Sequence, residues 1–233
     1  MKRIMFIGAC DKSDLLLYVS KLLTQAEQKV LLVDATREQS YSYAVPKIDA
    51  EYKITEFEGF DVAHGLFRYD ELEDYFHSNQ EKLNSYDALI IDTDRAEDIG
   101  HWAEIEHHLL VSTYDKPTIE KNVHLVRSLF ATRDSSELRM LKVIVQEVAC
   151  AITEEYIEST LTEFPIQWTE PSYPVYFDET DYAVKIDNQF NYRLNIKPLS
   201  KDYKVTIMEL AQLISGLPDG VVKKALKLAE KRK

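Results

Sequence analysis

The chain of 233 residues has 28 Lys and Arg against 40 Asp and Glu, a net charge of −12 at pH 7, and 45% of its residues are hydrophobic. This length and composition predict one globular domain, or two at most, and exclude a disordered or collagen-like chain. The negative charge argues against a protein that coats nucleic acid with its whole surface, because that binding depends on neutralising phosphates. The net charge does not exclude a local basic patch that binds nucleic acid.

The cysteines and the N-terminal residues bear on the compartment. Cys10 and Cys150 are far apart and have no partners at metal-ligand spacing, so we expect two buried thiols in a reducing compartment. The apolar stretch after Met1-Lys2-Arg3 is too short for a signal peptide or a membrane span. We therefore expect a cytoplasmic protein.

Short apolar runs and helix-length segments alternate along the chain. The runs expected to form strands are 4–9, 30–33, 88–91, 109–112 and 141–145. They are continuous instead of alternating, which is typical of strands buried on both faces of a parallel sheet. Segments with one apolar stripe lie between them at 14–28 and 119–132 and predict helices. The order predicts an α/β fold with a doubly wound, mostly parallel sheet and helices on both faces.

Two stretches depart from this alternation. Residues 49–81 are acidic and dotted with aromatics, and we expect a connecting excursion with one or two short helices. Residues 168–203 are rich in Tyr and Phe, and we expect an irregular start followed by helices, with the aromatics in the core more often than on a partner surface. His101, His107 and His108 lack a convincing third ligand, so we expect a solvated helix there and no metal site.

The segment after the first strand has the spacing of a phosphate-binding loop. A strand is followed by a tight turn that ends in Lys12-Ser13, then by an amphipathic helix and a second strand that ends at Asp34. Backbone N–H groups of such a turn and of the helix N-terminus hold phosphate oxygens, while a Lys and a hydroxyl serve phosphate and Mg²⁺. The sequence therefore predicts a nucleotide site at this turn.

Here the chain resembles the ParA/MinD family of P-loop ATPases. Residues 7–13, Ile-Gly-Ala-Cys-Asp-Lys-Ser, stand in the register of the family's Lys-Gly-Gly-x-Gly-Lys-Thr, and residues 85–93 resemble its second acidic strand end. The resemblance implies ATP or ADP with Mg²⁺ as ligands, Ser13 and Asp92 as the residues that meet the metal, and a homodimer. The nucleotide-binding positions that it implies are Gly8, Asp11, Lys12, Ser13, Asp34 and Asp92.

Three departures from the family pattern weaken the expected chemistry. The signature Lys that reaches the partner's nucleotide corresponds to Ile7, and the acidic residue that orients the attacking water corresponds to Thr36. The Gly before Lys12 is Asp11, which places a carboxylate near bound phosphates. At ~5 Å and an effective dielectric constant of about 20, that repulsion is on the order of 3 kcal/mol, or about two decades of affinity.

Asp11 also has a structural interpretation. As the N-cap of the following helix, with Asp14 three positions on, Asp11 can accept hydrogen bonds from the N–H groups of the first turn that would otherwise bind phosphate. We therefore expect little or no ATPase activity, and whether nucleotide binds stays open.

The loop residues also have a purely structural interpretation. Taken singly, Lys12 and Ser13 are ordinary first-turn residues of a flavodoxin-like domain, but the combined spacing favours a relict nucleotide site. No Asn that would recognise the base is evident after the fifth strand, where Gln146 is a weak substitute.

The C-terminus differs in charge from the rest, and we divide the chain into an α/β domain at 1–215 and a tail at 216–233. Apolar residues recur in the tail at helical spacing, which predicts an amphipathic helix with one basic face. Such a helix can bind an anionic membrane or DNA phosphates, or it can be a frayed end. The basic residues of the tail are Lys223, Lys224, Lys227, Lys231, Arg232 and Lys233.

The resemblance implies a positioning or scaffolding factor with weak or no ATP hydrolysis. The chain is most similar to the TadZ/CpaE pilus-assembly localisation type, whose members tolerate altered phosphate loops. We expect it to recruit a secretion, pilus or conjugation apparatus at the inner face of the membrane, as a homodimer formed across the face that carries residues 8–13. The alternative is a weak Mg-ATP-dependent dimerising ATPase of plasmid or chromosome partition, and a third hypothesis, a DNA-associated partition accessory, has less support.

Overall fold

A computed structural model describes residues 1–46, 52–132 and 137–231. Within these residues, nine strands form one sheet in the order β3-β4-β2-β5-β1-β6-β7-β8, and β9 also pairs with β7. The strands are β1 (Lys2–Ile7), β2 (Val30–Ala35), β3 (Ile54–Phe57), β4 (Phe60–His64), β5 (Ala88–Thr93), β6 (His107–Ser112), β7 (Leu138–Glu147), β8 (Ile166–Trp168) and β9 (Tyr173–Tyr176). The helices are α1 (Ser13–Gln25), α2 (Tyr41–Ala44), α3 (Tyr69–Ser78), α4 (Lys116–Ala131), α5 (Glu154–Ser159), α6 (Glu179–Phe190), α7 (Lys201–Ser215) and α8 (Asp219–Ala229), with short 3₁₀ turns at Leu83–Ser85 and Ile99–His101.

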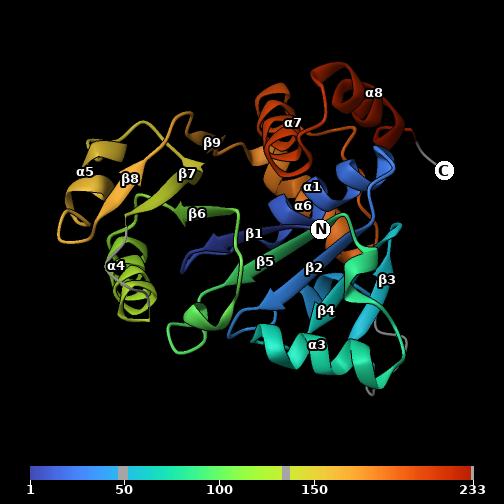
Figure 1. The fold of residues 1–233 in the computed structure, drawn as a ribbon. Coiled ribbons are helices and arrows are strands. Elements are labelled where there is room, and N and C mark those ends of the chain that lie inside the picture. The colour runs from blue at the N-terminus through green and yellow to red at the C-terminus, as the bar shows by residue number, and fades with distance from the viewer. Residues whose placement is uncertain (47–51, 133–136, 232–233) are drawn as a thin grey trace.

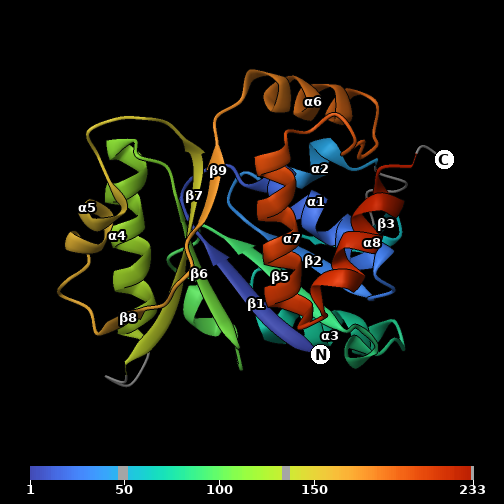
Figure 2. The ribbon, with the colours of Figure 1, turned by 90° about the horizontal axis from the view of Figure 1, so that it is seen from above.

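The sheet is covered by helices on both faces, as the continuous apolar runs predict. Helices α1, α7 and α8 lie on one face, and α3 and α4 lie on the other (Figures 1 and 2). In β1, Ile4 and Phe6 belong to the core under α1, whereas Met5 and Ile7 belong to the core under α3 and α4. All pairs except β3–β4 are parallel, so the predicted fold class is confirmed.

The excursion predicted at 49–81 contains more strand than the sequence suggested. Helix α3 is present, but β3 and β4 form a hairpin that extends the sheet, with β4 parallel to β2. The hairpin turns at Glu58 and Gly59, which both have positive φ, so a single glycine marks a turn that the acidic composition obscured. Residues 49–51 lie outside the described residues.

The aromatic segment at 168–203 is less buried than expected. Tyr173 and Tyr203 are core residues, but most of the others are at least half exposed: Tyr176, Phe177, Tyr182, Phe190 and Tyr192. Helix α6 turns Val184 and Asn188 inward, so residues on its opposite side face outward. The core expectation was therefore wrong for most of these side chains.

The histidines do not lie on a solvated helix. His107 and His108 belong to strand β6, and His101 ends a 3₁₀ turn. The described residues contain no group of three or more His, Cys, Asp or Glu side chains that could hold a metal ion.

Most of the basic tail forms helix α8, which packs three of its apolar residues into the core and leaves Val221 and Leu228 exposed. Val222, Ala225 and Ala229 are buried in the core shared with α1 and α7, so α8 presents its lysines outward from a docked position. Arg232 and Lys233 lie outside the described residues, and the division at 216 stays a prediction. None of the helices described within 1–46, 52–132 and 137–231 is both long and apolar enough for a bilayer span.

Candidate functional site

The loop from Gly8 to Lys12 joins β1 to α1 at the carboxyl end of the parallel strands, where ligands of open α/β sheets bind. The Gly8 N–H donates to the Thr93 carbonyl at 3.1 Å. In the sheet register, Asp92 of β5 is opposite both Phe6 of β1 and Asp34 of β2. The structure thus brings the six predicted nucleotide-site residues to one edge of the sheet, while Lys223, Lys224 and Lys227 lie on α8 and Lys231 just beyond its end.

Lys12 is enclosed by the protein. Its Nζ forms an ion pair with Asp92 Oδ1 at 2.6 Å and donates to the Gly8 carbonyl at 2.8 Å, and both charged side chains are almost fully buried. Burial alone would lower the pKa of Lys12, but the adjoining Asp92 carboxylate outweighs it and the pKa is raised. Lys12 therefore stays protonated, with its charge neutralised by Asp92 and not by a ligand.

Tyr41 of α2 connects the two strand-end carboxylates. Its hydroxyl donates to Asp92 Oδ2 at 2.7 Å, and its backbone N–H donates to Asp34 Oδ2 at 3.2 Å. Asp34 Oδ1 accepts from the N–H and the hydroxyl of Thr36 at 3.1 and 2.5 Å. Thr36, the residue in place of the family's water-orienting acid, thus holds Asp34 in position.

The buried Asp34 gives stability a defined pH dependence. Burial raises its pKa from 3.8 to about 6, so the folded protein keeps this proton to a higher pH than the unfolded chain does. The stability that Asp34 contributes is fully present below its unfolded pKa and is lost as pH rises to about 6, a loss on the order of 3 kcal/mol. Urea unfolding between pH 4 and 7 should show this loss in the wild type and not in Asp34→Asn, and parallel curves would contradict it.

The Asp11 carboxylate occupies the start of α1. Its Oδ1 accepts from the Ser13 N–H at 3.0 Å and from the Ser13 hydroxyl at 2.7 Å. The N-cap of α1 is Lys12, so Asp11 is not the N-cap that the sequence predicted, although its side chain does satisfy one N–H group of the first turn. Asp14 does not follow the prediction, because its carboxylate accepts from the Tyr203 hydroxyl at 2.8 Å. Lys185 of α6 pairs with Asp11 Oδ2 at 2.6 Å and lies 3.6 Å from Asp14.

Asn122 of α4 engages the loop from the other side. Its Oδ1 accepts from the Ala9 N–H at 2.9 Å, and its Nδ2 donates to the Val111 carbonyl at 2.9 Å. The amides of Gly8, Ala9 and Ser13 therefore all have partners within the protein. Sequence reasoning missed Tyr41, Asn122 and Lys185, because nothing in their local sequence marks a contact with a loop so distant in the chain.

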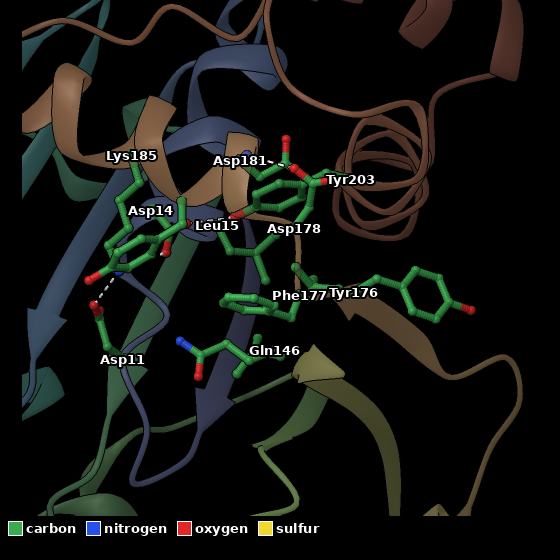
Figure 3. A pocket seen from close by; sticks show the side chains of 13 residues that line it. Asp11, Asp14, Leu15, Gln146, Tyr176, Phe177, Asp178, Asp181, Lys185 and Tyr203 are labelled. Carbon is green, nitrogen blue, oxygen red and sulfur yellow. Dashed lines mark hydrogen bonds and ion pairs between the residues drawn. The ribbon is translucent and has the colours of Figure 1, made fainter. Parts of the chain in front are cut away.

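A cleft of about 440 Å³ lies along the loop, lined by residues that include Lys12, Ser13, Asp92 and Arg37. On the other side of Asp11 is a much smaller pocket of about 50 Å³, in which Gln146 lies near Phe177 (Figure 3). That pocket has room for only a few water molecules. Gln146 thus lines a different pocket from the one that contains Lys12 and Asp92.

The two cysteines differ from the expectation and from each other. Cys10 is partly buried in the loop, and burial raises its pKa to about 11, so its thiol is protonated at neutral pH. Cys150 is exposed, so the expectation of two buried thiols was wrong for this residue.

Mg²⁺ prefers oxygen ligands, and a hydroxyl and a carboxylate are present in Ser13 and Asp92. Both are engaged: the Ser13 hydroxyl donates to Asp11, and Asp92 pairs with Lys12 and Tyr41. Ser13 and Asp92 can bind a magnesium ion only if they give up those hydrogen bonds and that ion pair.

The fold and the site define an α/β protein with a doubly wound sheet and a P-loop-like turn between β1 and α1. No family model matches the chain, and no curated protein matches its sequence. Solved structures show that the chain has the fold of the ParA/MinD ATPases. A ParA family ATPase from Chlorobium tepidum TLS is 14% identical, with a TM-score of 0.57 over 90% of this chain and 97% of that chain.

Two other solved structures extend the likeness along the chain. A chain of the MinC:MinD cell division protein complex of Aquifex aeolicus is 11% identical, with a TM-score of 0.58 over 100% of this chain and 98% of that one. A candidate plasmid partition protein of Borrelia burgdorferi B31, bound to AMPPNP, is 13% identical, with a TM-score of 0.53 over 98% and 99%. At these identities the likeness concerns the fold.

Proposed function

We propose that this protein is a positioning or scaffolding factor of ParA/MinD-like fold that hydrolyses ATP weakly or not at all. The observation that carries the proposal is that the loop's own groups are paired within the chain: Lys12 with Asp92, Ala9 with Asn122 and Ser13 with Asp11. A nucleotide would have to displace these partners, each of which already satisfies a buried or partly buried polar group. The protein therefore keeps the fold without depending on the nucleotide.

The proposed partners are a second copy and the proteins of a membrane-associated secretion, pilus or conjugation apparatus. The homodimer forms across the face that carries residues 8–13, because a loop without bound phosphates has less charge to bury. Helix α6 borders this loop through Lys185, and its exposed side chains Tyr182, Ile186 and Phe190 recur at helical spacing. Exposed apolar residues grouped in this way favour a protein interface.

Sedimentation equilibrium without nucleotide tests the dimer. The wild type should be dimeric at micromolar concentration, and Ile186→Glu/Phe190→Glu should be monomeric, because each copy would place two carboxylates in the interface. Val205→Glu/Val221→Glu is the matched control, since these exposed residues lie on α7 and α8. A monomeric wild type, or equal weakening by both pairs, would contradict this arrangement.

The lysines of α8 support peripheral attachment to an anionic membrane surface on its cytoplasmic side. Lys224 and Lys227 of α8 are exposed, as is Lys231 just beyond its end. Of the apolar residues of α8, Val221 and Leu228 are exposed and the others are buried or partly buried, so attachment would be mainly electrostatic. Sedimentation with vesicles that contain anionic lipid should be lost in Lys224→Glu/Lys227→Glu/Lys231→Glu. A variant with the same charge change at the exposed Lys82, Lys116 and Lys197 should still bind the vesicles. Equal loss of vesicle binding in both variants would show an effect of net charge alone and contradict attachment through α8.

The same two variants test the DNA-associated hypothesis. Loss of DNA retention in the α8 variant alone would favour that hypothesis instead.

The alternative function is a weak Mg-ATP-dependent dimerising ATPase in partition. The 440 Å³ cleft beside Lys12, Ser13 and Asp92 supports it, as does the structurally similar Borrelia protein bound to AMPPNP. Phosphate release that disappears in Lys12→Met/Asp92→Asn would favour this alternative. That variant removes both charges together and so leaves no lone charge in the core.

A further inference from the structure

The contacts of Asp11 are those that a phosphate group would make. One carboxylate oxygen accepts hydrogen bonds from the N–H and the hydroxyl of Ser13, in the first turn of α1. The other oxygen accepts a hydrogen bond from the ammonium group of Lys185. A helix N-terminus, a hydroxyl and an ammonium are the donors that bind phosphate oxygens in proteins. The chain thus places an anion of its own at the position where the sequence predicts a bound one.

Lys185 is held over the loop by the docking of α6. Near its N-terminus, Asp181 accepts from the N–H and hydroxyl of Ser200 at 2.7 and 2.6 Å. One turn beyond Lys185, Asn188 donates to the Tyr18 hydroxyl of α1 at 3.0 Å. The side chain of Lys185 is only 14% exposed, and Figure 3 shows it pointing from α6 to Asp11.

The Asp11–Lys185 pair stays ionised at neutral pH. Burial opposes both charges, but Lys185 and Ser13 outweigh it and lower the pKa of Asp11, and the two neighbouring carboxylates likewise raise the pKa of Lys185. The charged groups around the pair are Asp14 on α1, 3.6 Å from Lys185, and Asp178 and Asp181 at the start of α6, which line the same pocket. Protonation therefore does not open the contact near pH 7, and a competing anion is required.

We propose that the contact of Lys185 with Asp11 closes the site to phosphate ligands, and that Lys185, which lines the small pocket beside Asp11 and not the cleft itself, binds a phosphate ligand once Asp11 no longer holds it. The proposal rests on the proposed function, because it specifies how the site is kept without nucleotide. Asp11 lines both the 440 Å³ cleft and the 50 Å³ pocket, so it stands between them. The ligand class that opens the site is a polyphosphate, whose charge competes for Lys185 and Ser13 where a single carboxylate now lies.

Calorimetric titration with magnesium pyrophosphate tests the closure. Asp11→Gly should bind about a hundredfold more tightly than the wild type, because it removes the repulsive carboxylate and releases Lys185. Asp11→Gly/Lys185→Met should lose most of that gain. If the glycine variant does not fold, Asp11→Asn serves instead, because it removes the charge and keeps an oxygen for Ser13. Equal affinity of wild type and the Asp11 variant, or a double variant that keeps the full gain, would overturn the proposal.

Amide hydrogen exchange of α6 gives a readout that needs no ligand. Lys185→Met should speed exchange in α6 at least tenfold, whereas Lys204→Met should not. Lys204 is a matched control, since its ion pair with Glu230 is 2.8 Å long and its side chain is 16% exposed. Unchanged exchange in Lys185→Met would contradict the closing contact. Tight ATP binding by the wild type would contradict the proposed function. The differences among these variants in pyrophosphate affinity and in amide exchange of α6 would still decide the role of Lys185.

Discussion

Replacing Lys12 with methionine is expected to lower the free energy of unfolding by about 3–5 kcal/mol, because it leaves the buried Asp92 carboxylate without its cation. Asp92 is almost fully buried, and without Lys12 it would keep the Tyr41 hydroxyl, which donates to it at 2.7 Å. Urea unfolding at pH 7 measures the loss.

The double variant Lys12→Met/Asp92→Asn is the control for this prediction. It removes both charges, and the Asn oxygen can still accept from Tyr41, so most of the lost stability should return. A single Lys12→Met variant as stable as the wild type would show that Lys12 is not neutralised by Asp92 in the folded protein.

Gly8→Ala is expected to cost about 3 kcal/mol or more, because overpacking of a close backbone contact forces strands to shift. A Cβ at Gly8 would lie 2.1 Å from the Val111 carbonyl oxygen of β6, the strand next to β1. The glycine thus serves the packing of the loop on the sheet, whatever the ligand.

Gly220→Ala is the matched control. No atom lies within 4 Å of a Cβ built at this position in the first turn of α8, and its φ is not positive. Alanine there should leave stability unchanged or raise it by about 0.5 kcal/mol, because it reduces the entropy of the unfolded chain. Thermal unfolding of both variants measures the difference, and an equal effect would contradict the close approach at Gly8.

The central part of the fold could be predicted because burial on both faces leaves a strong sequence signal. The runs that became β1, β2, β5, β6 and β7 are apolar at successive positions, and odd and even residues serve different cores. Short edge strands carry a weaker signal. In β3 only every second residue is buried, so an acidic four-residue strand such as Ile54–Phe57 resembles a loop.

The part of the candidate site whose residues are close together in the sequence could be predicted. The spacing of Gly8, Lys12 and Ser13 follows from the strand, turn and helix that contain them. The partners that determine what the site can do come from distant positions. Lys185 is 174 residues from Asp11, and Asn122 is 113 residues from Ala9. Such contacts depend on how α6 and α4 dock, which no pattern in one sequence specifies.

The loop pairs its Lys12 with Asp92, its Ala9 with Asn122 and its Ser13 with Asp11, all within the chain. Calorimetric titration of the protein with ATP and with ADP, each in the presence of Mg²⁺, measures whether a nucleotide displaces these partners, with Lys12→Met/Asp92→Asn as the control. We expect no saturable heat below about 1 mM nucleotide, a free energy of binding weaker than about 4 kcal/mol. Binding at micromolar nucleotide that is lost in the control would contradict the proposed function and establish a nucleotide-dependent switch.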